Sequence, residues 1–150
     1  MLKTLEEPIN KLGIDMVNEI ISVLESNDKI ASGRLVKSIS HEYQLDLDNI
    51  KLLISSEDYL TYVDKGRKPG KFAPIAPIKE WARIKGIDES AAYAINYKIF
   101  KFGIKPLNFM EGIETKFSKP DKFGGVIKQY NKIVSDYLKW EFEQIQKNMK

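Results

Sequence analysis

Cations and glycines gather in the stretch Tyr62 to Pro77, which reads "YVDKGRKPGKFAPIAP". Seven of its residues hold two glycines, Gly66 and Gly70, and four cations, Lys65, Arg67, Lys68 and Lys71. Glycine-rich loops with nearby cations can cradle phosphate groups through their backbone amides. The stretch therefore poses three alternatives: a phosphate loop for chemistry, a loop that touches nucleic acid, or a structural turn that holds a protein assembly together.

The phosphate-loop alternative fits the spacing poorly. A nucleotide-binding P-loop reads G-x-x-x-x-G-K-[ST] and lies between a buried strand and a helix. Here three residues separate Gly66 from Gly70, and Phe72 stands where the metal-binding hydroxyl belongs. Pro69 lies inside the would-be cradle and has no amide hydrogen to donate. The pattern argues against nucleotide hydrolysis.

Few other side chains are suited to catalysis. The chain has no cysteine and a single histidine, His41, which excludes thiolate catalysis and multi-histidine metal sites. Carboxylate pairs such as Glu57/Asp58 and Asp88/Glu89 fall on predicted helix surfaces or caps, whereas acid–base catalysis needs a carboxyl group in an apolar pocket. We expect no enzyme, cofactor or metal, and we expect His41 to be a half-buried strand residue bonded to a neighbour.

The length and composition predict one globular domain that spans residues 1–150. Hydrophobic residues make up 43% of the chain and charged residues 30%, and the formal charge of +3 is too small to indicate nucleic acid by itself. No apolar run approaches the roughly 20 residues of a membrane helix, and no signal peptide is recognisable. We expect a protein that is made and used in a cytoplasm, or in something assembled there, without a membrane partner.

Helical periodicity dominates the two ends of the chain. A helix is predicted over 4–28, with Thr4 and Glu7 as a capping box, and a long amphipathic helix over 125–148. The buried face of the first helix follows steps of three or four and comprises Leu5, Ile9, Leu12, Met16, Ile20 and Leu24.

The region between these helices mixes strands and short helices. Ser32 is expected to cap a short helix that is followed by a hairpin with its turn at Asp46–Asn49. Its buried face would hold Ile39, His41, Tyr43 and Leu45 on one strand and Ile50, Leu52 and Ile54 on the other.

The second half of this middle region predicts a pair of helices. A helical turn ends at Gly66, two helices follow over 77–85 and 89–103, and a strand is expected over 109–115. The predicted fold is α+β: a small antiparallel sheet flanked by an N-terminal helix, a central helical pair and a long C-terminal helix.

Nucleic-acid binding is a stronger alternative to a structural turn than phosphate chemistry is. Tyr62 and Phe72 bracket the cationic loop, and Lys98, Lys101 and Lys105 are candidates for DNA or phosphate contact. Cations interleaved with aromatic rings can bind the phosphate backbone and stack bases. A solvated loop in a lysine-rich protein is the plainer interpretation, because no recognisable nucleic-acid-binding platform surrounds the loop.

Three segments in order resemble one protein family. The first, G-x-L-x-x-S-I, is matched by Gly33, Leu35, Ser38 and Ile39. The second, Y-x-x-Y-V-[ED]-x-G-[TR], is matched by Tyr59, Tyr62, Val63, Asp64, Gly66 and Arg67. The third, G-I-x-P-x-x-F, is matched by Gly103, Ile104, Pro106 and Phe109. Over about 31–113 the chain resembles the tail-completion, or head–tail joining (neck), proteins of long-tailed bacteriophages.

The resemblance implies a structural virion protein of the tail and neck, assembled in the host cytoplasm. Such a protein is no enzyme. It forms a homo-oligomeric ring, commonly a hexamer, that terminates the tail tube, binds the tail-tube protein and joins the tail to the head connector or stopper protein. DNA passes through the centre of the ring, in at most transient, non-specific contact.

The residues expected to contact a neighbouring subunit or partner are those of the loop, together with two aromatic anchors. They are Lys65, Gly66, Arg67, Lys68, Pro69, Gly70, Lys71, Phe72, Trp81 and Phe109. Glycines permit tight turns and prolines stiffen the loop, which reduces the entropy lost on docking. The alternative function is a small nucleic-acid-binding protein that uses the basic loop 65–71.

Overall fold

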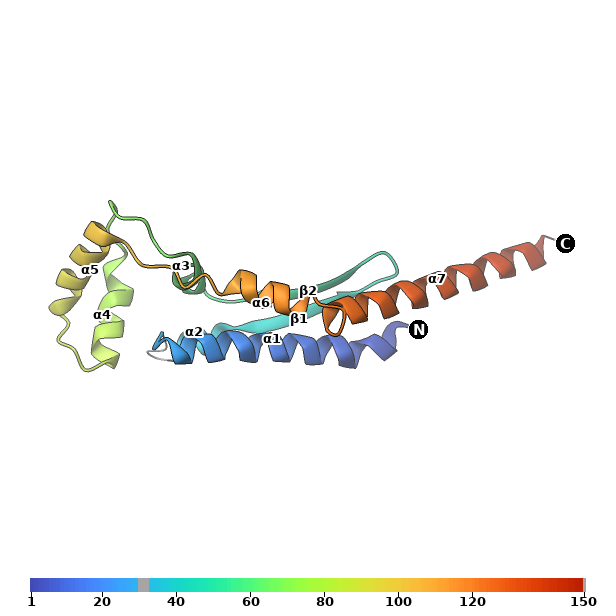
Figure 1. The fold of residues 1–150 in the computed structure, drawn as a ribbon, viewed down its shortest axis with the longest axis horizontal. Coiled ribbons are helices and arrows are strands. Elements are labelled where there is room, and N and C mark those ends of the chain that lie inside the picture. Colours follow the sequence, from blue (N-terminus) through green and yellow to red (C-terminus); the bar gives the residue numbers. More distant parts are fainter. Residues whose placement is uncertain (30–32, 150) are drawn as a thin grey trace. The chain divides into compact units, whose positions relative to one another are not determined.

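The computed structural model describes residues 1–29 and 33–149 and confirms the α+β class (Figure 1). The elements in chain order are η1 (Leu2–Leu5), α1 (Glu6–Ser26), α2 (Arg34–Ser38), β1 (Ser40–Leu45), β2 (Ile50–Ser55), α3 (Tyr59–Lys65), α4 (Ile75–Ile84), α5 (Ala91–Phe102), α6 (Met110–Phe117) and α7 (Phe123–Asn148). The strands β1 and β2 form a two-stranded antiparallel sheet, and α4 packs against α5 as the predicted helical pair. Within the described residues, no helix is both long and apolar enough to span a membrane.

The chain divides into two compact units. The first unit is built from three segments, which begin at Met1, His41 and Ile113. The second unit comprises Glu19–Ser40 and Ser55–Gly112, and it contains the whole cationic loop. The helix α1 contributes its first part to one unit and its last part to the other.

The core of the first unit joins the two ends of the chain. Leu5 and Ile9 are fully buried against Val126 and Tyr130 of α7. The Tyr130 hydroxyl donates a hydrogen bond of 2.7 Å to the carbonyl oxygen of Asp46 in the hairpin turn. Burial raises the pKa of Tyr130 above its ordinary value, in keeping with a phenol that is protonated and donates this bond. The apolar residues that recur along the N-terminal and C-terminal helices therefore pack together in one core.

The β hairpin alternates as predicted on one strand and only partly on the other. Ile50, Leu52 and Ile54 of β2 are half-buried, whereas their neighbours are exposed. On β1, Tyr43 is 38% exposed although it was expected on the buried face. A two-stranded sheet buries only a small part of its surface, and the central residues of β1 do not belong to that part.

A glycine in the middle of α1 makes room for the only histidine. A Cβ atom at Gly13 would overlap the imidazole ring of His41. The ring is half-buried, and its Nε2 atom forms a hydrogen bond of 2.8 Å with the side-chain oxygen of Asn10. The prediction of a strand histidine bonded to a neighbour is confirmed, and Gly13 is its steric counterpart.

Gly13→Ala should lower the free energy of unfolding by about 1–2 kcal/mol, because overpacking against His41 outweighs the gain in helix propensity. Gly112→Ala in α6 is the matched control, since nothing lies within 4 Å of a Cβ placed there. That variant should gain up to about 1 kcal/mol. Urea denaturation of the three proteins checks both values, and equal shifts for the two alanines would contradict the steric argument.

Several predicted boundaries are wrong in instructive ways. The segment expected as a strand over 109–115 forms the helix α6, because its N-terminus is capped by a residue far upstream in the sequence. Thr4 lies in the 3-10 helix η1 rather than at a capping box, and α1 begins at Glu6. Ser32, the expected cap of α2, falls outside the described residues. The long C-terminal helix begins at Phe123 instead of residue 125.

The helical pair also buries a polar residue and begins earlier than predicted. In α5, Ala92 is fully buried, Asn96 is buried although it is polar, and Phe102 is 70% exposed. The helix α4 begins at Ile75 rather than Pro77, directly after Pro74. The burial of Asn96 reflects its two hydrogen bonds with Ala73 of the cationic loop, which sequence periodicity does not contain.

Candidate interaction site

The base of the cationic loop is an antiparallel bridge between two distant residues. The amide of Arg67 donates to the carbonyl of Ile104 at 2.9 Å, and the amide of Ile104 donates to the carbonyl of Arg67 at 2.8 Å. These two bonds join the second and third family-like segments. We call residues 66–73, which begin at this bridge, the bridge loop.

Two glycines make the bridge possible. Gly66 and Gly103 have φ angles of +71° and +73°, in the region that favours glycine. A Cβ atom on Gly66 would overlap the Ile104 carbonyl, and one on Gly103 would overlap the Arg67 carbonyl. Each glycine therefore allows the opposite backbone to approach, and no other residue fits at either position.

Asp64 extends the pairing beyond the bridge. Its buried carboxylate accepts hydrogen bonds from the amides of Phe109 at 2.8 Å and Met110 at 3.0 Å. These amides lie at the start of α6, where a helix lacks internal acceptors. The Asp64 carbonyl also accepts from the amide of Asn108 at 2.9 Å. Asp64 thus acts as the N-cap of a helix that begins 46 residues later.

Asp64→Ala should lower the free energy of unfolding by about 2 kcal/mol, because two partly buried amides at the start of α6 lose their acceptor. Asp64→Asn keeps an oxygen in place and should lose less than half as much. Hydrogen exchange at Phe109 and Met110 measures the cap directly: it should accelerate in the alanine variant. Unchanged exchange there would contradict the capping role.

The tip of the bridge loop is held against α5. The amide of Gly70 donates to the carbonyl of Phe100 at 2.7 Å. The Phe72 and Phe100 rings stack with centroids 4.4 Å apart and an interplanar angle of 11°. The Arg67 guanidinium donates to the Phe72 carbonyl at 3.0 Å, so the loop is also closed from within.

A buried asparagine ends the loop. The side chain of Asn96 accepts from the amide of Ala73 and donates to its carbonyl, each at 2.9 Å. This pair of bonds copies the pairing of one strand with another, and it fixes the chain where α4 begins. Sequence reasoning missed Asn96, and it named Asp64 only as a residue of the second family-like segment. The available signal was a polar residue on the apolar face of a predicted helix.

The predicted contact residues fall into two groups. Lys65, Lys68, Pro69, Gly70, Lys71 and Phe72 are exposed, and Phe72 is 57% exposed despite its stack. Gly66 and Arg67 are half-buried and serve the loop itself. The Arg67 guanidinium lies 5.4 Å from the centroid of the Tyr62 ring, and its Nε atom is buried with no hydrogen-bond partner among the described residues.

The two predicted aromatic anchors lie in different surroundings. Trp81 of α4 is half-buried and lines a pocket. Phe109 is half-buried and its amide is bound by Asp64. Lys98, Lys101 and Lys105 are all exposed. Because Phe100 and Ile104 bond to the loop, these three lysines adjoin the chain segments that hold it.

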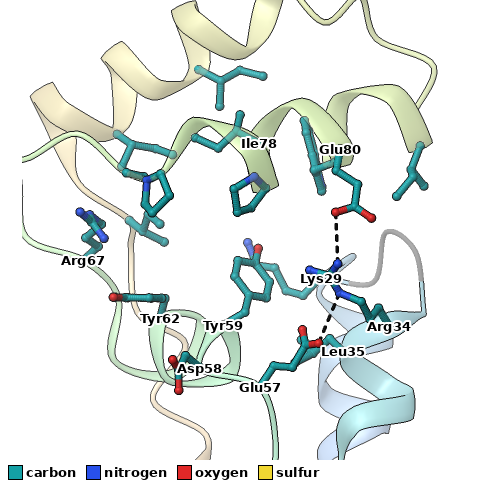
Figure 2. A pocket seen from close by; sticks show the side chains of 18 of the residues that line it. Lys29, Arg34, Leu35, Glu57, Asp58, Tyr59, Tyr62, Arg67, Ile78 and Glu80 are labelled. Atoms are coloured by element: carbon teal, nitrogen blue, oxygen red, sulfur yellow. Dashed lines mark hydrogen bonds and ion pairs between the residues drawn. The ribbon is translucent and has the colours of Figure 1, made fainter.

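A pocket of about 780 Å³ lies within the second unit and is lined mainly by apolar side chains (Figure 2). Its aromatic walls are Tyr59, Tyr62 and Trp81. At one side Arg34 forms ion pairs with Glu57 at 3.3 Å and with Glu80 at 3.2 Å. These two carboxylates are the ion-pair partners of the Arg34 guanidinium, and the lining also contains Lys29, Asp58 and Arg67.

The pKa shifts of three further groups move their pKa values away from neutral pH. Burial raises the pKa of Tyr59, a hydrogen bond with Tyr93 raises that of Lys79, and hydrogen bonds from Ser90 lower that of Asp88. None of these shifts prepares a group for proton transfer near neutral pH. Among residues 1–29 and 33–149, no cluster of three or more histidine, aspartate or glutamate side chains could hold a metal ion.

Comparisons with protein-family models, with curated proteins and with solved structures give no match. The resemblance to the neck proteins of long-tailed phages therefore stays a prediction that depends on the three segments alone.

Proposed function

We propose that this chain is a structural virion protein whose ring terminates a phage tail tube and joins it to the head connector or stopper, with DNA passing through the centre. The role requires neither catalysis nor a cofactor. What supports the proposal is the pairing of the second and third family-like segments. Gly66, Arg67, Gly103 and Ile104 are motif residues, and all of them belong to one backbone bridge.

This bridge presents a loop that is already ordered before any partner binds. Backbone or side-chain bonds hold it at Arg67, Gly70, Phe72 and Ala73. Its exposed residues, Lys68 to Phe72, lie between those anchors. A preformed loop loses little conformational entropy on docking, which favours a repeated contact between subunits.

A closed ring also needs a second, different surface on each subunit, because its interface is heterologous. The last part of α7, in the first unit, carries large exposed apolar residues that suit this requirement. Leu138, Trp140, Phe142 and Ile145 are between 53% and 63% exposed. Under the proposal, neighbouring subunits or the tail-tube protein cover this surface.

Lys68→Glu/Lys71→Glu should abolish joining of heads to tails while the fold is retained, because both side chains are exposed and both reverse sign. Arg67 is unsuitable for such a reversal because its side chain closes the loop. Lys11→Glu/Lys37→Glu is the charge-matched control at exposed positions elsewhere. The variants are supplied in trans to a phage lacking the gene, and joined particles are counted by electron microscopy. Normal joining by the loop variant would refute the loop contact.

Purified particles of that phage should contain the chain at a low, fixed copy number near one ring, about six per particle by the resemblance to hexameric neck proteins. Quantitative mass spectrometry measures this number relative to the tail-tube protein. Absence from the particles would overturn the structural role, whatever the loop variants do.

A further inference from the structure

One face of α5 carries a row of aromatic rings. Tyr93, Tyr97 and Phe100 are spaced i, i+4 and i+7, so they share one side of the helix. Tyr93 is 60% exposed and Tyr97 is 56% exposed. The Tyr97 and Phe100 rings lie 6.3 Å apart, and Phe72 of the bridge loop stacks on Phe100 and continues the row.

The core of the second unit does not need this row. The residues of α5 that are buried are Ala92 and Asn96, which lie on another side of the helix. Two exposed tyrosine rings along one helix, continued by the exposed Phe72 ring that stacks on the half-buried Phe100, are costly in water and indicate a surface that binds something. Tyrosines four positions apart on a helix are separated by about 6 Å along its axis. That spacing is comparable to the distance between neighbouring bases in an extended single strand.

The charge around the row is mainly positive, although Glu89 lies near enough to Lys79 to help raise the pKa of its ammonium group. Residues 65–79 and 90–110 contain no aspartate or glutamate. The same two segments contain eight cations: Lys65, Arg67, Lys68, Lys71, Lys79, Lys98, Lys101 and Lys105. The ammonium of Lys79 lies 4.9 Å from the centroid of the Tyr93 ring, so at least one cation adjoins the row directly.

We propose that this aromatic–lysine face, made of Tyr93, Tyr97, Phe100, Phe72 and the lysines beside them, binds single-stranded nucleic acid. Bases stack on the exposed rings, and the lysines neutralise the phosphates. The site goes beyond the proposed ring and does not depend on it.

The main competitor is an acidic protein segment. Such a partner would pair with the lysines, but carboxylates gain nothing from a row of flat rings. Double-stranded DNA would likewise use the lysines alone, because its bases are already stacked on one another. The contribution of Tyr93 and Tyr97 therefore separates the proposed ligand from both alternatives.

The test is fluorescence anisotropy with a labelled oligo-dT of about 20 nucleotides and a duplex of equal length. The full chain should bind the single strand at least tenfold more tightly than the duplex at about 50 mM salt. Tyr93→Ala/Tyr97→Ala should weaken single-strand binding at least tenfold. Tyr43→Ala/Leu53→Ala, which removes an exposed ring and an exposed apolar side chain from the hairpin, is the control and should change nothing.

The lysines are tested separately by salt dependence. Lys98→Gln/Lys101→Gln should reduce the slope of log affinity against log salt by about 1.4, the value for two lost phosphate contacts on a single strand. Circular dichroism verifies that each variant is folded.

Three outcomes would overturn the proposal. They are no binding to oligo-dT at low salt, equal affinity for the duplex with no effect of the tyrosine variants, or equal competition by poly-glutamate with no such effect. Sedimentation of the same variants without oligonucleotide monitors self-association, so a failure of the ring and a failure of this site are distinguished.

Discussion

The second unit depends on one close approach of two backbones, at Arg67 and Ile104. The approach is possible because glycine stands next to each of them, with the φ angle that only glycine adopts at little cost. From this point Asp64 reaches α6 on one side, and Gly70 reaches α5 on the other. A side chain at either glycine would therefore disturb a helix start, a helix end and a loop together.

The sequence predicts the elements whose signal is local. The periodic apolar residues of α1 and α7 identify both helices, and alternation in Ile50, Leu52 and Ile54 identifies β2. The sequence does not predict the helix α6, because the Asp64 carboxylate that caps its N-terminus is remote in sequence. Asn96 was missed for the same reason, since its partner Ala73 is 23 residues away.

The candidate site also contains some features that could be predicted from the sequence and others that could not. A cluster of exposed cations could be predicted from residue types alone, and Lys68, Lys71, Lys98, Lys101 and Lys105 are exposed. The structural role of Arg67 could not be predicted from residue types. It depends on contacts with Phe72 and Tyr62 that exist only in the folded loop. Motif residues of the resemblance thus mostly build the scaffold, while the residues between them meet the solvent. A resemblance that depends on such residues is evidence for the fold rather than for the function. The function depends on the site that the fold supports.

The interleaving of the two units has a consequence for synthesis on the ribosome. Leu5 and Ile9 are translated before the second unit, yet they are buried against Val126 and Tyr130, which are translated after it. All segments of the second unit, Glu19–Ser40 and Ser55–Gly112, are translated before these partners exist. The second unit can therefore fold while the apolar face of the nascent N-terminal helix is still waiting for α7. Contacts of such long sequence separation form slowly and leave apolar surface exposed in the interval. The apolar residues of η1 and of the first turns of α1 therefore stay without their packing partners until α7 has been synthesised.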